Sequence, residues 1–164
     1  MKFDTSIVKA HYPSPLGPMI VAATARGLAG VWFEGQRHLP DHSNWPVQAD
    51  HPVLRQAQVQ LAEYFAGHRS SFDLPLDLQG GTAFQRSVWD ALLAIPRGGT
   101  TSYGTLSRSI GQPAAVRAVG AAVGRNPLSI VVPCHRVVGA DGSLTGYAGG
   151  LERKTALLRL EGAA

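Results

Sequence analysis

The chain has 164 residues, of which 45% are hydrophobic and 16% are charged, and its formal net charge is +4. This composition fits one or two small domains with a hydrophobic core and excludes a disordered chain. No stretch approaches the roughly 20 apolar residues of a membrane span, and the N-terminus opens no apolar run like that of a signal peptide. We therefore expect a cytoplasmic protein that does not contact membranes.

The first half of the chain, residues 1–79, is predicted to form a small α/β domain. Alternating apolar residues indicate strands, and apolar residues three or four apart indicate a helix that Gly67 ends. The expected elements, in chain order, are β structure over residues 6–34 with a hairpin of Met19–Ala23 and Leu28–Phe33, a loop over 35–50, a helix over 51–67 and a final strand over 71–78.

The second half, residues 80–164, is predicted to form a mainly helical domain that begins after Gly80-Gly81. Thr82 is a suitable helix N-cap, and Pro96 would stop that helix. Two short helices joined by a glycine-containing turn have the helix-turn-helix pattern. The expected elements are helices over residues 82–95, 103–110, 114–123 and 151–160, a turn at 111–113, and a glycine-rich loop over 139–150, with Leu151, Leu157, Leu158 and Leu160 facing inward. The fold class is thus α+β.

Charge is distributed unevenly between the two halves. Residues 1–79 carry six Lys/Arg and seven Asp/Glu, whereas residues 80–164 carry nine and four. A basic half fits a polyanionic partner, although solubility alone can explain it. The second helix of the helix-turn-helix has small side chains and one charge, Arg117. Such a thin helix suits the minor groove and the insertion of one side chain into the base stack. A buried alanine-rich helix is the alternative.

Cys134 is the one cysteine of the chain, so an internal disulfide is excluded. Most lone buried cysteines are inert packing residues. Cys134 instead follows an apolar run and a proline, where we expect a strand to leave the core, and His135 and Arg136 come next. A cysteine is nucleophilic as the thiolate. Glu161 on the last helix could orient His135, which would give a nucleophile–base–orienter relay.

The sequence Pro133-Cys134-His135-Arg136-Val137, preceded by Gly124-Arg125-Asn126-Pro127, resembles the signature of the O6-alkylguanine-DNA alkyltransferases, also called methylated-DNA–protein-cysteine methyltransferases. The resemblance covers about residues 82–162. Three more ordered blocks support it: Ser102-Tyr103-Gly104, Ala115-Val116-Arg117-Ala118-Val119-Gly120 and Thr145-Gly146-Tyr147-Ala148-Gly149-Gly150-Leu151. The first half resembles the N-terminal domain of the bacterial members more weakly, through Ser14-Pro15-Leu16-Gly17.

The resemblance implies a ribonuclease H-like first domain, a winged-helix-like second domain and a DNA repair function. The protein would bind the minor groove as a monomer, flip O6-alkylguanine out of the duplex and move the alkyl group irreversibly to Cys134, once per molecule and without a cofactor. O4-alkylthymine is a further candidate substrate, and cooperative binding along DNA is left open.

The resemblance also implies a role for each matching residue. Cys134 would accept the alkyl group, His135 would deprotonate it through a water, and Glu161 would hold His135. Asn126 would tie the recognition helix to the active-site segment, and Tyr103 would rotate the nucleotide and donate to the base. The expected DNA-binding residues are Arg117, Tyr103, Ala115, Ala118, Gly120 and Ala121, and the expected substrate-binding residues are Val137, Tyr147, Ala148, Gly149 and Lys154.

Ala148 departs from the family pattern, because several members have a serine there that bonds the O6 atom. Only backbone N–H groups could make that bond here, and the extra room would favour larger alkyl groups. We expect no metal site, because no cysteine lies outside the active site and the other histidines are scattered.

Three other functions fit part of the sequence. A cysteine hydrolase would use the same relay but would gain nothing from the helix of Arg117. A pure helix-turn-helix binder or a lesion sensor would bind DNA without chemistry, but the sensors replace the cysteine. A repair protein coupled to transcription would need a further domain and metal-binding cysteines.

Overall fold

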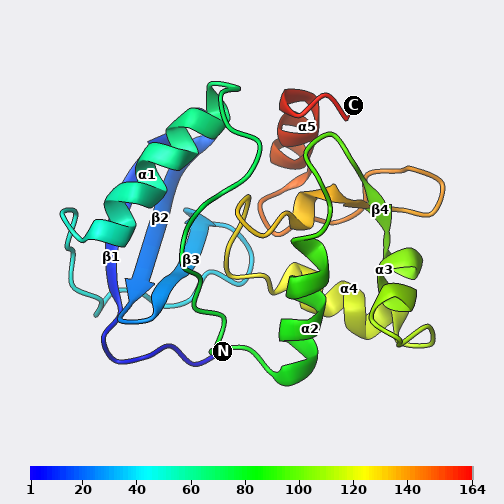
Figure 1. Ribbon diagram of the computed structural model, residues 1–164, viewed down its shortest axis with the longest axis horizontal. Coiled ribbons are helices and arrows are strands. Elements are labelled where there is room, and N and C mark those ends of the chain that lie inside the picture. Colours follow the sequence, from blue (N-terminus) through cyan, green and yellow to red (C-terminus); the bar gives the residue numbers. More distant parts are fainter. Residues whose placement is uncertain (164) are drawn as a thin grey trace.

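Residues 8–33 form a three-stranded antiparallel sheet of order β1–β2–β3, and one helix lies across it (Figure 1). The computed structural model describes residues 1–163. The elements of this first part are β1 (Val8–Ser14), β2 (Gly17–Thr24), β3 (Gly27–Phe33) and α1 (Pro52–Phe65). The expected hairpin and helix are confirmed. Helix α1 packs its buried face, which includes Leu61 and Tyr64, toward the sheet.

The opposite face of the sheet is covered by loops that carry aromatic rings. Phe3 packs edge-on against Trp32 and Trp45, with ring centroids 5.8 and 5.3 Å away. Gly30 lies beneath the Trp32 ring, where a Cβ atom would come within 1.9 Å of it. The sheet is therefore buried on both faces, which explains why β2 and β3 are almost continuously apolar.

The prediction of a strand over residues 71–78 is wrong. This segment forms one isolated bridge to the sheet, between Leu28 and Leu76. The Leu28 N–H donates to the carbonyl oxygen of Pro75, and the Asp77 N–H donates back to Leu28. Pro75 has no N–H to extend a ladder, so the alternating pattern gives only an extended segment at the edge of the sheet.

The second part of the molecule is mainly helical and includes the expected helix-turn-helix, α3 and α4. Thr82 and Gln85 form a capping box at the start of the preceding helix. A short parallel pair, β4 with β5, is not expected from the sequence. The elements are α2 (Ala83–Leu92), β4 (Thr101–Ser102), α3 (Tyr103–Ser109), α4 (Val116–Gly124), the 3₁₀ helix η1 (Cys134–Arg136), β5 (Val137–Val138) and α5 (Leu151–Leu160). The α+β class is confirmed.

Two details of the helices differ from expectation. Leu151 is 48% exposed rather than inward-facing, because the first turn of α5 lies at the surface and its buried face begins at Lys154. Helix α4 is neither fully buried nor free. Val119, Ala122 and Val123 are buried, and the Trp89 indole N–H donates to the Ala122 carbonyl at 2.8 Å. The other face of α4 is exposed, so it is available to a partner.

Cys134 does not follow a strand, contrary to expectation. Leu128 forms an isolated bridge to Val31, residues 129–131 form a turn, and Ile130 has a φ of +73°, which is unusual for a β-branched residue. The segment also completes the edge of β3: the Val31 N–H donates to the Pro127 carbonyl, and the Ser129 N–H donates to the Val31 carbonyl. A bonded, turned segment therefore replaces the strand that the apolar run suggests.

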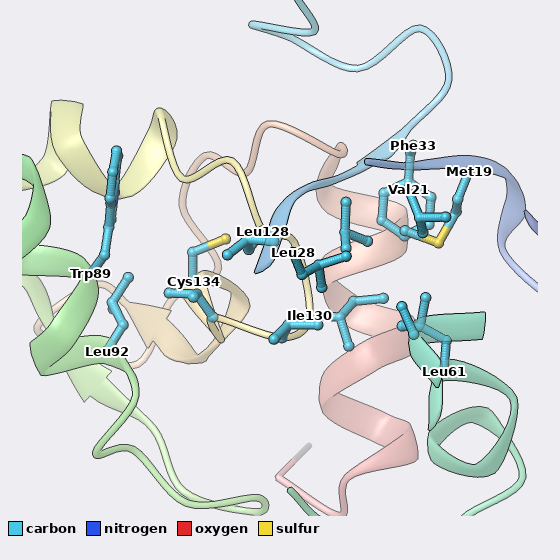
Figure 2. Packing of buried hydrophobic residues seen from close by; sticks show 14 of the residues in the cluster. Met19, Val21, Leu28, Phe33, Leu61, Trp89, Leu92, Leu128, Ile130 and Cys134 are labelled. Carbon is cyan, nitrogen blue, oxygen red and sulfur yellow. The ribbon is translucent and has the colours of Figure 1, made fainter. Parts of the chain in front are cut away.

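One hydrophobic cluster runs through both parts of the molecule. Figure 2 shows Cys134 in its middle, with Trp89 and Leu92 on one side and Leu28 and Ile130 on the other. The nucleophile candidate is thus built into the shared core. No helix within residues 1–163 is long and apolar enough to cross a membrane.

Candidate active site

A pocket of about 600 Å³ opens between helix α4 and the loop that precedes α5. Cys134 lines this pocket although only 5% of the residue is exposed. Three of the lining residues are arginines, namely Arg37, Arg117 and Arg125. A buried sulfur reached through a basic mouth suits an electrophile attached to an anionic polymer.

The thiol of Cys134 is protonated in the resting protein. Burial raises the pKa of Cys134 to about 11, although Asn126 and the Lys154 charge favour the thiolate. The neighbouring charges in the sequence suggest a thiolate, but burial outweighs them. A base must therefore remove the proton as the thiol reacts.

His135 lies next in the chain and is fully buried against Glu161. Its Nε2 atom lies 2.7 Å from Oε2 of Glu161. Burial opposes ionisation of Glu161, but the hydrogen bonds from His135 and Arg136 bring the pKa of Glu161 down to about 2. An ionised Glu161 accepts a hydrogen bond from Nε2, so Nδ1 carries the free lone pair of the neutral ring.

The other ring nitrogen of His135 is thus available as a base. Burial lowers the pKa of His135, so its imidazole stays neutral near pH 7. Nδ1 is buried and has no hydrogen-bond partner among residues 1–163. The arrangement of Cys134, His135 and Glu161 has the chemistry of a nucleophile, a base and an orienter.

Glu161 has two further partners that the sequence does not reveal. Arg136 donates from Nε to Oε1 at 2.8 Å and from a terminal nitrogen to Oε2 at 3.0 Å. The hydroxyl of Tyr64, from α1 of the first part, donates to Oε2 at 2.5 Å. The sequence places Tyr64 only on the apolar face of its helix, and no local signal distinguishes it from a core residue.

Asn126 fixes the segment between α4 and the nucleophile. Its amide nitrogen donates to the Val132 carbonyl at 2.7 Å, and its amide oxygen accepts from the Leu128 N–H at 3.0 Å. Because Asn126 closely follows the end of α4, this buried pair of bonds sets how α4 and Cys134 lie relative to each other.

The loop before α5 is held by two consecutive cationic residues. Lys154 is fully buried and donates to the carbonyl oxygens of Val137 at 2.6 Å and Thr145 at 3.0 Å. Arg153 donates to the Gly149 carbonyl at 3.2 Å. The Ala148 carbonyl also accepts a backbone bond from Arg37 at 3.0 Å. The wall of the pocket is therefore fastened at several points.

Helix α4 forms the facing wall and the surface beside it. Arg117 is exposed at the mouth of the pocket. A Cβ atom added at Gly120 would lie 3.7 Å from the Tyr103 ring, so the ring packs close to this face of α4. The Tyr103 hydroxyl accepts a bond from Thr145 at 3.3 Å and thereby spans the two walls.

The structure brings many of the expected site residues together. Cys134, Tyr103, Arg117, Gly120, Ala121, Tyr147 and Ala148 line the pocket. His135, Glu161, Asn126, Lys154, Val137 and Gly149 are buried beside or behind it, and Ala115 and Ala118 lie on or next to α4 outside it. Within residues 1–163 no three His, Cys, Asp or Glu residues gather as a metal site would require.

Two family models match the chain. The model described as "6-O-methylguanine DNA methyltransferase, DNA binding domain" matches residues 83–163, and the model described as "6-O-methylguanine DNA methyltransferase, ribonuclease-like domain" matches residues 7–78. The two matches together span both parts of the structure.

Curated relatives have similar lengths. A methylated-DNA–protein-cysteine methyltransferase of Methanosarcina acetivorans is 48% identical over 93% of this chain and 97% of its own length. A protein of the same name from Mycobacterium tuberculosis is 49% identical over 92% of both chains.

Solved structures agree. The crystal structure of Mycobacterium tuberculosis OGT in complex with DNA has a TM-score of 0.85 at 46% identity and covers 96% of this chain and 92% of that one. The O6-methylguanine-DNA methyltransferase of Pyrococcus kodakaraensis has a TM-score of 0.67 at 28% identity, with 95% and 99% covered.

Proposed function

This chain belongs to the family of the 6-O-methylguanine DNA methyltransferases, and we propose that it repairs O6-alkylguanine in DNA by moving the alkyl group to Cys134. The observation that carries this assignment is the buried Cys134 thiol at the base of a pocket whose mouth bears Arg117. The His135–Glu161 pair behind the thiol supplies the base that a protonated nucleophile needs.

The chemistry follows from the positions of these groups. Nδ1 of His135 takes the thiol proton through a water, and the sulfur attacks the alkyl carbon. The carbon–oxygen bond breaks and its electron pair stays on the guanine oxygen. The leaving guanine takes up a proton with help from the Tyr103 hydroxyl. The product is a thioether that water cannot readily cleave, so each molecule reacts once.

The reacting oxygen is part of a stacked base, so we propose that the nucleotide is flipped into the pocket from the minor-groove side. Flipping costs a few kcal/mol. Arg117 would fill the gap in the stack, and the small residues Ala115, Ala118 and Ala121 would let α4 approach the narrow groove closely. Tyr103 would press against the phosphate, and Tyr147, Ala148 and Gly149 would cover the base.

The two halves would divide the work. Residues 80–164 would bind DNA and react, and residues 1–79 would support them as a ribonuclease-like domain. We propose that the protein acts as a monomer in the reducing cytoplasm, where a lone thiol stays free.

The direct test uses a duplex oligonucleotide with one O6-methylguanine and intact-mass spectrometry. We expect one added methyl group per protein molecule, located on Cys134 by peptide mapping and absent in Cys134→Ala. His68→Gln, an exposed change in the first half, is the control and should react fully. Several turnovers per molecule, or no transfer, would refute the proposal.

A further inference from the structure

Tyr64 joins the two halves of the molecule at the active site. Its hydroxyl donates to the same oxygen of Glu161, Oε2, that bonds Nε2 of His135. Arg136 also donates to this oxygen, so its three partners come from α1 and η1, and Tyr64 is separated from Glu161 by 97 positions. Tyr64 is fully buried, so water cannot replace its hydroxyl without a change in packing.

Tyr64 stays protonated, and so remains a donor, at neutral pH and well into the alkaline range. Burial, followed by the adjacent Glu161 carboxylate, raises the pKa of Tyr64 well above its ordinary value. The Arg97 guanidinium lies 5.1 Å from the centre of the Tyr64 ring and donates to the Leu160 carbonyl, next to Glu161. Glu161 thus holds the Tyr64 hydroxyl, and Arg97 packs over the Tyr64 ring.

Several titratable or charged groups surround His135. Glu161, Arg136 and Lys154 act on the ring directly, and Cys134 precedes it in the chain. Tyr64 reaches it through Glu161, Arg97 packs on Tyr64, and Tyr147 lies near Cys134 and Tyr64. Glu161 is the group among them that carries a negative charge at neutral pH and so stabilises a positive charge on His135, whereas the arginines and Lys154 repel one.

The basicity of His135 therefore depends on how strongly the negative charge of Glu161 acts on its ring. We propose that Tyr64 is a positioning residue for the alkyl transfer, which, by sharing Oε2 of Glu161, keeps His135 neutral and ready to accept the thiol proton. This inference rests on the proposed function, and it gives the first domain a direct part in the chemistry.

Removal of the Tyr64 hydroxyl should raise the pKa of His135. The carboxylate would lose one donor, and its charge would act more strongly on the His135 ring. His135 would then take up a proton at a higher pH. A protonated His135 cannot accept the thiol proton, so the acid limb of the transfer rate against pH would move upward.

The test compares Tyr64→Phe with the wild-type protein in single-turnover transfer from a methylated oligonucleotide across pH 5 to about 9, the range over which His titrates. We expect the acid limb of the Tyr64→Phe profile to lie at least about half a pH unit higher on the pH axis. At a fixed pH on that limb the rate would then be about threefold lower. Tyr12→Phe is the matched control, because that hydroxyl bonds no residue within the described range, and its limb should not move.

A second measurement does not depend on transfer. The His135 imidazole is titrated by NMR in unreacted protein, with its signal assigned by its absence from His135→Gln. We expect the same upward shift in Tyr64→Phe. If Tyr64→Phe does not fold, 3-fluorotyrosine placed at position 64 keeps the ring and strengthens the donor, and the limb and the titration should then move downward.

The outcomes separate the two proposals. A folded Tyr64→Phe whose rate falls equally at all pH values, with an unmoved His135 titration, would mean that Tyr64 is only structural. A shift in the opposite direction would also overturn the inference. A wild-type protein that transfers no alkyl group would refute the proposed function, while the NMR titration would still decide the role of Tyr64.

Discussion

The guanidinium of Arg153 lies 4.4 Å from the centre of the Phe33 ring and joins helix α5 to the sheet of β1, β2 and β3. Arg153 also donates to the carbonyl oxygen of Leu16 at 3.0 Å and to that of Gly149 at 3.2 Å. One side chain therefore ties the pocket wall to both the end of β3 and the turn between β1 and β2.

We expect Arg153→Gln to loosen this wall. The loss of a cation–π contact and two hydrogen bonds should lower the free energy of unfolding by about 1–2 kcal/mol. Transfer at low DNA concentration should slow by about threefold to tenfold, mainly because the DNA concentration needed for half-saturation is higher. Arg159→Gln is the control, because Arg159 is exposed on the same helix. Single-turnover rates against DNA concentration decide it, and equal behaviour of the two variants would contradict the assignment.

Arg117→Ala should affect duplex DNA more than a free base. If Arg117 offsets part of the cost of flipping, which is a few kcal/mol, its loss should slow repair of a duplex by about tenfold or more. Transfer from free O6-benzylguanine, which needs no flipping, should change by less than about twofold. Rates with both substrates are measured in one preparation, and equal losses would mean that Arg117 does not assist flipping.

Ala148→Ser tests the pocket next to the sulfur. Ala148 lines the pocket while its carbonyl is bonded by Arg37, so the new hydroxyl would reach the substrate from a fixed backbone. We expect methyl transfer to gain about threefold to tenfold, as one hydrogen bond allows, and the ratio of benzyl to methyl transfer to fall. Ala121→Ser, on the opposite wall, should leave that ratio unchanged. An unchanged ratio in Ala148→Ser would refute the size argument.

The Cys134 thiol should lose its proton only at high pH. Since burial raises the pKa of Cys134 to about 11, modification of the free protein by iodoacetamide should be slow at neutral pH and should still be rising at about pH 10. The group has a raised pKa in the folded state, so its contribution to stability is complete below the unfolded pKa and is lost as pH rises through the folded one. Mass spectrometry of the single labelled site follows the rate, and a plateau near neutral pH would show a resting thiolate.

Local sequence rules predict much of the fold correctly. The capping box of Thr82 and Gln85 fixes the start of α2, and the apolar spacing of α1 fixes its buried face. These signals act within a few residues, so a single sequence contains them. They fail at Ser71–Leu78, where Pro75 interrupts the ladder, and at Leu151, whose exposure depends on where α5 meets the core.

The site is predictable only where its residues are neighbours in sequence or match family blocks. Cys134 and His135 adjoin, and Glu161 is recognisable as a carboxylate at the end of the last helix. Tyr64 and Arg153 escape sequence reasoning, because their partners lie 97 and 137 positions away in the chain. The left-handed Ile130 escapes it as well, because tertiary bonds rather than its own preference impose that conformation.

The distance in sequence between the partners of Glu161 also sets the order in which they can meet during synthesis. The chain leaves the ribosome from its N-terminus, and early segments fold first. The sheet and α1 can pack while Glu161 is still to be made, 97 positions after Tyr64 and 26 after His135. Cys134 and its base His135 thus emerge before the carboxylate that orients the base. An acceptor that can be used only once is therefore not spent on a half-made molecule.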